Sequence, residues 1–523
     1  MPPDPAQPVW RSVHKITPIL NAWKVVVAVV VATVWQLGDE LQNIPEVWER
    51  FERYRTTALL IILGIVLVVA VVAGIYSWLA WRRMKFAVTS ESVDLHSGIL
   101  FRRQRHARLV RVQAVDVVQP LLGRIFGLGQ VKVETAGGNE SNVIIGYLKE
   151  AEAQALRNEV MARAAGVAGP PAGQAPGGQP SGGQAHAEAG APDDASASSP
   201  LFVAAPERQM LHVPAGRLVG SLVLSPVLIF FILFIVGLGV AAYFAGSAAP
   251  IFGTLPALLG WVAALWGRFA GEFHFRVAIS PDGIRLRHGL LESRSQTLPP
   301  GRVQAVQLTQ PLLWRPAGWW RVRINVAGYG AAEGSGGNVE TVLLPVGPRG
   351  DALTALWLVL PDLGVADPRA VLDAALDGSG EAGGFRTSPR RARWLDPLTW
   401  RRNALFITGT ALLIRSGRWT RNLVVVPHER TQSLALEQGP LERRCRIANL
   451  HAHSVSGPVT PVVFHLDEML ARHVLVEQAA RARTARAAEG PEEWMRRVEA
   501  AGAVHPPAAD GPQQPSPGGT AAP

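Results

Sequence analysis

Long apolar runs separate this chain into membrane-like and soluble-like stretches. Residues 56–81 form a run of 26 residues without a charge. About 20 apolar residues let a helix cross the hydrocarbon layer of a bilayer. A weaker run from Ile16 to Gly38 contains one charge, Lys24, whose side chain can reach the interface; a buried core helix is the alternative for this run. We predict a first transmembrane hairpin over residues 16–81.

The second apolar stretch is stronger. Residues 218–267 contain no Asp, Glu, Lys or Arg in 50 positions. A short turn is predicted over residues 245–250, and Pro226 and Pro256 would kink the two spans, which membrane helices tolerate. The chain is therefore predicted to be a membrane protein with two transmembrane hairpins, four helices in all.

Basic residues next to the apolar runs predict the orientation. They come before the first span and after the second span of each hairpin, at Arg11, Lys15, Arg82, Arg83, Lys85, Arg217, Arg268 and Arg276. The loop 39–55 has three arginines, which are evidence against an outside location, but five acids accompany them. The positive-inside rule then predicts a multi-pass protein of the cell (inner) membrane, with both termini and everything between the hairpins in the cytoplasm.

Outside these runs, short segments alternate apolar and polar residues, as in Val131–Glu134 and Val322–Val326. This period of two is typical of half-buried strands. Three such regions share one pattern, in which a Leu/Ile-x-x-Gly sequence contains Gly98, Gly289 or Gly417. Glycine accepts a positive φ without steric cost, so each is predicted to lie in a hairpin turn.

The three copies also share an arginine and a glutamine at fixed offsets. Thirteen residues after each glycine comes an arginine, and two residues later a glutamine, which gives Arg111 and Gln113, Arg302 and Gln304, and Arg430 and Gln432. Six residues further comes Gln-Pro-Leu, which the third copy interrupts with one inserted glycine. These six residues are the candidate binding residues; the competing interpretation is that they satisfy a neighbouring turn.

Each copy ends in a helical pattern, and composition marks the connections between copies. The closing helices are predicted at 149–163, 351–360 and 466–483. Residues 164–207 are nearly all small or polar and cannot bury enough apolar surface to fold. The predicted domains are 84–163, 271–362 and 400–483, with a disordered linker at 164–207, a second linker at 364–390 and a disordered tail at 500–523.

These motifs, placed behind apolar hairpins, resemble the bacterial pleckstrin-homology-like (PH-like) domain in membrane proteins of the YdbS/YdbT type. The resemblance covers residues 9–162 and 208–475. It implies an α + β fold with three PH-like β-barrel domains, each capped by a C-terminal helix. It implies no catalytic activity. The third copy departs most, because Thr431 replaces valine and no hairpin directly precedes it.

Charge and candidate chemistry narrow the function. The net charge of +10 suits anionic lipid or nucleic acid, but no nucleic-acid recognition motif accompanies it. One cysteine, Cys445, excludes an internal disulfide framework. His451 and His453 have a spacing that metals can use, yet no third ligand is evident. We expect no metal, no cofactor and no enzymatic activity.

The sequence thus favours a membrane-anchored scaffold or binding module, with a role in envelope integrity as one possibility. Its expected partners are anionic headgroups, an unidentified membrane protein or further copies of the chain. Arginine-rich stretches in all three copies would contact headgroups, although a charge run is more often only a solvated face. The alternative is a subunit of a transport or export system, which the scarcity of ionisable residues in the spans disfavours.

Overall fold

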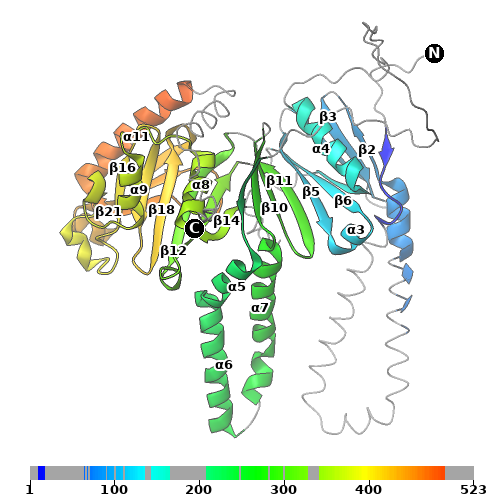
Figure 1. Ribbon diagram of the computed structural model, residues 1–523, viewed down its shortest axis with the longest axis horizontal. Coiled ribbons are helices and arrows are strands. Elements are labelled where there is room, and N and C mark those ends of the chain that lie inside the picture. Colours follow the sequence, from blue (N-terminus) through cyan, green and yellow to red (C-terminus); the bar gives the residue numbers. More distant parts are fainter. Residues whose placement is uncertain are drawn as a thin grey trace, which may run out of the picture.

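The fold consists of three β-rich repeats in a row, from which two long helices project (Figure 1). The computed structural model describes residues 10–17, 64, 67, 68, 71, 72, 74–89, 91–98, 102–109, 112–135, 143–164, 208–246, 249–280, 283–298, 301–327 and 341–488. The predicted first hairpin, 16–81, lies largely outside these residues, as do the linker 164–207 and the tail 500–523.

Each repeat contributes four strands and then three strands followed by a helix. In the first repeat these are β1 (Arg11–Ser12), β2 (Lys85–Val88), β3 (Ser92–Ser97), β4 (Arg103–Arg108), β5 (Val112–Pro120), β6 (Leu128–Thr135), β7 (Val143–Lys149) and α4 (Glu150–Ala164). In the second they are β8 (Arg208–His212), β9 (Arg276–Ser280), β10 (Gly283–His288), β11 (Glu292–Leu298), β12 (Val303–Pro311), β13 (Trp319–Val326), β14 (Val342–Pro348) and α8 (Arg349–Val359). In the third they are β15 (Arg386–Thr387), β16 (Ala404–Ile407), β17 (Ala411–Ser416), β18 (Thr420–Pro427), β19 (Ser433–Glu437), β20 (Ile447–His453), β21 (Val462–Asp467) and α11 (Glu468–Ala488).

The hydrogen-bonded sheets do not coincide with the repeats. One seven-stranded sheet has the order β7-β6-β5-β11-β10-β9-β8, and a second has the order β14-β13-β12-β18-β17-β16-β15. Strand β5 of the first repeat therefore pairs with β11 of the second, and β12 of the second pairs with β18 of the third. This differs from the expected three self-contained barrels: neighbouring repeats are joined by continuous sheets.

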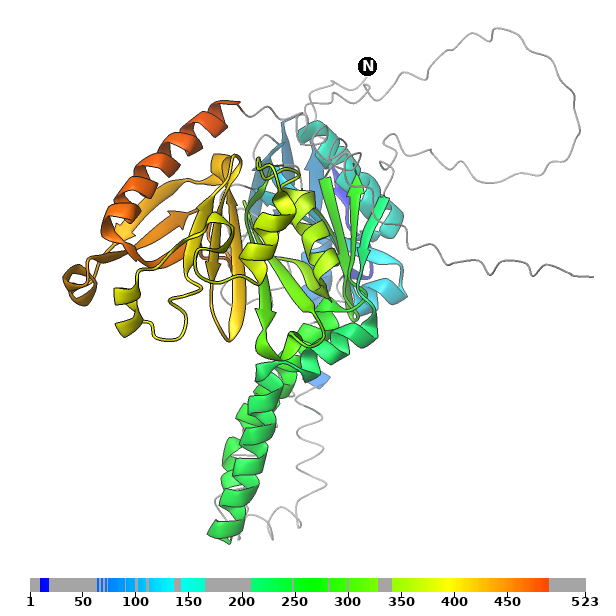
Figure 2. The same cartoon turned by 60° about the vertical axis from the view of Figure 1, so that its left-hand side comes forward.

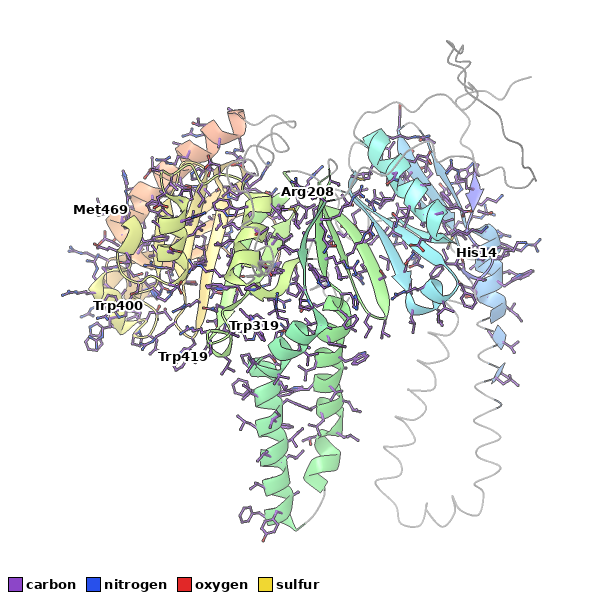
Figure 3. The ribbon with its side chains drawn as sticks, in the orientation of Figure 1. His14, Arg208, Trp319, Trp400, Trp419 and Met469 are labelled. Atoms are coloured by element: carbon purple, nitrogen blue, oxygen red, sulfur yellow. The ribbon has the colours of Figure 1, made fainter. Side chains whose placement is uncertain are left out.

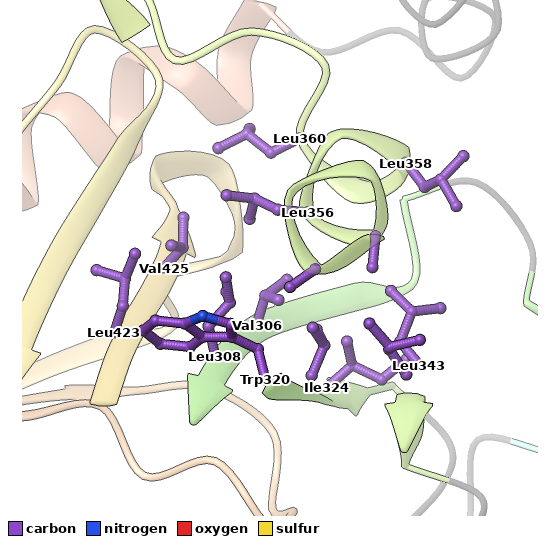
Figure 4. Packing of buried hydrophobic residues seen from close by; sticks show 14 of the residues in the cluster. Val306, Leu308, Trp320, Ile324, Leu343, Leu356, Leu358, Leu360, Leu423 and Val425 are labelled. Atoms are coloured by element: carbon purple, nitrogen blue, oxygen red, sulfur yellow. The ribbon is translucent and has the colours of Figure 1, made fainter. Parts of the chain in front are cut away.

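Each hydrophobic core lies between the two halves of one repeat, beneath its closing helix. Figure 4 shows the core of the second repeat, where Trp320 and Leu356 pack beside Leu423 and Val425 of the third. Neighbouring residues of β18 alternate between cores, because Val424 and Val426 belong to the core of the third repeat. This follows from the period of two along a strand, and it makes one sheet the shared wall of two cores.

The repeated glycines have the backbone conformation that the sequence predicts. Gly98, Gly289 and Gly417 all have positive φ, at 100°, 115° and 78°. A Cβ atom at Gly289 or Gly417 would lie 1.8 or 2.0 Å from the backbone oxygen of the residue three positions later. Only glycine fits such a turn, so the prediction is confirmed.

The second apolar stretch forms three helices, α5 (Ala215–Val223), α6 (Pro226–Ala245) and α7 (Ala249–Glu272). Pro226 does not kink a span: it is the first residue of α6, and Ser225 caps that helix by accepting a hydrogen bond from the Leu228 amide. Among the described residues, only α6 is long and apolar enough to cross a membrane. The predicted total of four spans is therefore not confirmed.

The connection between the second and third repeats folds, although residues 364–390 were expected to be a linker. Helix α9 (Pro368–Leu376) begins at the capping residue Asp367, and its side chains Leu372 and Leu376 are buried in the core of the second repeat. Leu372 and Leu376 are four residues apart, which places them on one face of a helix. The Gly and Asp residues of the same segment led to the prediction of a linker.

Candidate functional site: the hairpin position of the third repeat

All three repeats contain an insertion at one topological position, between a short first strand and the strand that pairs with it. The paired strands are β1 and β2, β8 and β9, and β15 and β16. The second repeat inserts α5–α7 there, and the amide of Val213 bonds to the carbonyl of Phe275 across its base. In the third repeat the matching bond runs from Ser388 to Asn403, and it closes a much shorter insertion, residues 388–403, which we call the hairpin-position loop.

The hairpin-position loop is rich in arginine and tryptophan. It starts with the single-turn helix η6 (Arg390–Trp394) and borders an open hollow of about 1030 Å³. The hollow is lined by Ser379, Gly380, Thr387, Arg390, Arg393, Trp394, Pro397, Trp400 and Arg401. Cationic and aromatic groups thus gather at the place where the second repeat sends its helices out of the β-rich body.

Large apolar side chains of this loop face solvent. Trp394 is 90% exposed and Leu398 is 51% exposed. Burying a side chain of this size contributes roughly 1.5–3 kcal/mol, so an uncovered tryptophan is unfavourable in water. An aromatic ring with a polar edge is well suited to the headgroup level of a bilayer.

The arginines of the loop fall into two classes. Arg391 forms an ion pair with Asp467 and is thereby held against the third repeat. Arg390, Arg393 and Arg401 are exposed, and no ion pair joins them to an acid among the described residues. The guanidinium of Arg401 lies 5.3 Å from the ring centre of Trp400, a cation–π contact. Three cations are thus available to an anionic ligand.

Two buried arginines hold the base of the loop. Arg402 donates to the carbonyls of Ala375, Leu376 and Gly378, at the C-terminal end of α9. Arg415 donates to Ala374, Gly380 and Arg402. Burial lowers the pKa of each to about 10, so both remain charged at neutral pH. Cations favour a helix C-terminus, and the sequence gives no signal that separates these structural arginines from the exposed ones.

The loop belongs to a wider rim of tryptophans that are exposed or half-buried. Figure 3 labels Trp400, Trp419 and Trp319 along the edge of the body from which α6 and α7 project. Trp419 is 61% exposed, and Arg315 donates to its carbonyl oxygen at 3.3 Å. Trp319 packs on α5, since a Cβ at Gly220 would lie 2.8 Å from its ring.

The Gln-Pro-Leu motifs contribute to exposed apolar surface as well. Each leads into a short helix: α3 (Leu121–Ile125), η3 (Leu312–Trp314) and α10 (Pro440–Arg444). Their exposed side chains include Leu121, Ile125, Leu312, Leu313 and Leu441. Figure 1 places α3 at the lower edge of the first repeat, on the side toward which α6 projects. The motif therefore positions apolar side chains, a role that its sequence alone did not reveal.

The structure describes the surroundings of four of the six predicted binding residues, Arg302, Gln304, Arg430 and Gln432. Arg302 and Arg430 lie close enough for the charge of Arg430 to lower the pKa of Arg302, in addition to the larger effect of burial. Gln304 is buried and donates to the Arg302 carbonyl at 3.4 Å, whereas the side chain of Gln432 is exposed. Arg111 lies outside the described residues, and Gln113 lies on β5. Arg302 and Arg430 lie near the junction of β12 with β18, between the second and third repeats. The binding role of all six residues stays a prediction.

The other candidate groups have ordinary surroundings. His451 and His453 stack with ring centres 5.9 Å apart, and the Nε2 atom of His451 lies 3.2 Å from Glu437. Among the described residues no group of three or more His, Cys, Asp or Glu side chains could hold a metal ion. Cys445 is a partly exposed free thiol.

Comparison with known proteins gives two matches. A family model described as "Bacterial PH domain" matches three segments, residues 40–164, 221–354 and 387–486, which together make up well over half of the chain. The UPF0699 transmembrane protein YdbT of Bacillus subtilis (strain 168) is 24% identical over 88 residues, which cover 17% of this chain and 18% of that protein. The match therefore spans less than a fifth of the relative's length. No solved structure matches the chain.

Proposed function

This chain belongs to the bacterial PH domain family, and from that premise we propose that it is a non-enzymatic module of the cell membrane whose third repeat binds anionic lipid headgroups through the hairpin-position loop. The observation that carries the proposal is topological. A loop with exposed Trp394 and Leu398, and with three arginines that pair with no acid in the part of the chain that the structure describes, occupies the position from which the second repeat sends out its apolar helices.

Membrane attachment is supported by α6 and by the named relative. Helix α6 has 20 residues, and none of them is charged. Its side chains are almost all exposed, which is the arrangement of a helix surrounded by lipid rather than by protein. The matched relative is itself called a transmembrane protein. The multi-pass arrangement and the cytoplasmic location of the repeats rest on the sequence pattern.

The chemistry of the loop favours a headgroup over an uncharged ligand. Each Lys or Arg near an anionic leaflet contributes about 1 kcal/mol, and tryptophan and leucine can enter the interface beside them. The alternative of a transport subunit has no observation in its favour among the described residues, because α6 contains no ionisable side chain except Tyr243 near its end.

The proposal is tested with the full chain in lipid nanodiscs. In a Cys445→Ser background, Leu398→Cys carries a fluorophore whose emission shifts to shorter wavelength in a less polar environment. A matched control carries the label at Val476, which is 66% exposed on α11. We expect the label at position 398 to shift when phosphatidylglycerol replaces part of the phosphatidylcholine, and the label at 476 to stay unchanged.

Variants then test whether the response depends on the charge of the loop arginines or only on the closeness of the loop to the bilayer. Changing Arg390, Arg393 and Arg401 to Gln should remove the dependence on phosphatidylglycerol, because the loop loses its exposed cations. Changing Arg208, an exposed arginine on β8, to Gln is the control and should leave it intact. A label at 398 that does not respond to phosphatidylglycerol in the unmodified loop would contradict the proposal.

A further inference from the structure

The two ends of the row of repeats carry incomplete sheets. At one end of the row, strands of the first repeat form a four-stranded sheet of order β1-β2-β3-β4. At the other end, strands of the third repeat form a three-stranded sheet of order β19-β20-β21. Both internal sheets have seven strands, formed by three strands of one repeat and four of the next. The terminal sheets are therefore the two halves of one more sheet of the same kind.

The two internal junctions share a single register. At the first, Arg294 of β11 lies opposite Val118 of β5; at the second, Asn422 of β18 lies opposite Thr309 of β12. Arg294 and Asn422 each come five residues after the repeated glycine, and Val118 and Thr309 each come one residue before the glutamine of Gln-Pro-Leu. The junction is thus a repeated structural unit with a fixed offset.

We propose that copies of this chain assemble head to tail, with β19 of one copy pairing antiparallel to β4 of the next and completing a third seven-stranded sheet. The same offset places Arg103 opposite Glu437 and Gln104 opposite Leu436. Among the described residues, no strand pairs with the outer edge of β4 or of β19. Unpaired strand edges readily pair with another chain.

Charge and exposure suit this pairing. Strand β4 contains Arg103, Arg105 and Arg108, and Arg103 is exposed. The carboxylate opposite it, on Glu437, is 66% exposed and contacts His451. Basic residues on an edge often prevent pairing, but β11 and β18 carry Arg294 and Arg421 and are nevertheless paired inside the chain. Arginine at this position is therefore compatible with the junction.

The geometry has a consequence for the assembly. An interface between two different surfaces of identical chains produces a closed ring or an open filament. In Figure 1 the row of repeats runs across the direction in which α6 and α7 project. A head-to-tail assembly would accordingly extend in the plane of the bilayer, and its partner is a second copy of this chain.

Disulfide crosslinking in detergent micelles tests the pairing without any contribution from lipid. Two chains are prepared in the Cys445→Ser background, one with Arg103→Cys and one with Glu437→Cys. Residues directly opposite in an antiparallel pair have Cα atoms roughly 4.5–5.5 Å apart, a spacing that a disulfide spans. We expect the mixture to form dimers after mild oxidation, and a chain carrying both substitutions to form a ladder of higher oligomers.

Each single variant alone, and a register control, decide the interpretation. Arg108→Cys mixed with Glu437→Cys should give little dimer, because five residues along a strand separate the sites by roughly 17 Å. Dimers from Arg103→Cys alone would indicate a head-to-head contact and overturn the proposal, as would the absence of any dimer from the mixture.

Charge reversal provides a second measurement that needs no cysteine. Glu437→Arg should weaken self-association roughly twofold to fivefold, the range expected for an exposed ion pair, and Arg103→Glu in the same chain should restore it. Because both residues are exposed, neither change should prevent folding. Equal association of Glu437→Arg and the unmodified chain would argue against this register.

Discussion

The second and third repeats have the same strand order and differ most at the hairpin position. The second repeat fills it with α5, α6 and α7, and the third fills it with residues 388–403. The strands on either side pair in the same way in both repeats. Figure 2 shows α6 and α7 extending far beyond the β-rich body. One fold therefore accepts either a long apolar insertion or a short basic and aromatic one.

This difference indicates that the fold of the repeat does not depend on which insertion occupies the hairpin position. The second repeat has an apolar helix, α6, at this position, whereas the third has the basic and aromatic side chains that we propose to bind headgroups. The third repeat is held instead by the sheet that it shares with the second and by the folded connection through α9. Variants can test each of these supports separately.

The largest effect is expected from the buried arginine at the base of the loop. Arg415→Met would leave the carbonyls of Gly380 and Arg402 without the donor that Arg415 supplies, whereas the carbonyl of Ala374 would keep the amide of Gly378. Leaving buried polar groups unsatisfied costs about 1–3 kcal/mol each, so we expect the free energy of unfolding to fall by about 3 kcal/mol in chemical denaturation. Arg393→Met, on the exposed face, should change it by less than about 0.5 kcal/mol. Equal effects of the two would mean that the loop arginines are not divided as described.

A smaller effect is expected at the contact between the second and third repeats. Asn325 is fully buried; its amide donates to the Val459 carbonyl at 2.6 Å and its oxygen accepts from the Val459 amide at 2.9 Å. Asn325→Ala should lower the free energy of unfolding by about 2 kcal/mol, because both Val459 groups lose their partners. Asn449→Ala, in the partly buried bonds to Glu442 and His465 within the third repeat, is the comparison. It should expose the third repeat to protease less than Asn325→Ala does.

Single substitutions in the exposed set should act on lipid alone. We expect each of three substitutions to reduce the free energy of binding to phosphatidylglycerol by about 1 kcal/mol, without changing thermal stability: Arg390→Gln, Arg393→Gln and Arg401→Gln. Raising the salt concentration should shrink the response, since exposed charges are screened. A response that persists in high salt would assign it to Trp394 and Leu398 instead of the arginines.

The smallest effect is a dependence of stability on pH through His428. Burial lowers the pKa of this side chain, whose Nδ1 atom lies 2.9 Å from Gln478 and whose Nε2 atom lies 3.0 Å from the Thr408 carbonyl. The unfolded chain therefore binds a proton at a higher pH than the folded chain. The neutral His428 side chain contributes fully to the free energy of unfolding above the ordinary histidine pKa. This contribution is lost as the pH falls toward the lower pKa of the folded chain. Thermal unfolding between pH 7.5 and 5.5 should show this loss, and His428→Gln should reduce it.

Much of the fold could be predicted from local pattern. The three glycines, the closing helices and the turn near Gly246 all depend on residues close in sequence, and the structure has them within a few positions of the prediction. The joining of β5 to β11 and of β12 to β18 could not be predicted, because strand pairing over such separations leaves no periodic signal. The resemblance to a barrel domain favoured the wrong assumption that each repeat closes on itself.

The candidate site was harder to predict for a related reason. Arg393, Arg402 and Arg415 belong to one arginine-rich region of the sequence, yet the first is exposed and the other two are buried against α9. Only the position of α9, itself expected to be linker, distinguishes them. Trp394 has an apolar residue four positions later, Leu398, but both side chains are exposed in the structure. Their exposure becomes informative only once the hairpin position of the second repeat is known.

The most direct measurement is the depth of the hairpin-position loop in a bilayer. Spin labels at Leu398 and, as a control, at Val476 in the Cys445→Ser chain would be read in nanodiscs by collision with oxygen, which concentrates in lipid, and with a water-soluble nickel complex. We predict that the label at 398 collides more with oxygen and less with nickel than the label at 476, which places the loop at the interface. Equal collision ratios at the two positions would mean that the third repeat faces water on this side, and would contradict its proposed role at the membrane.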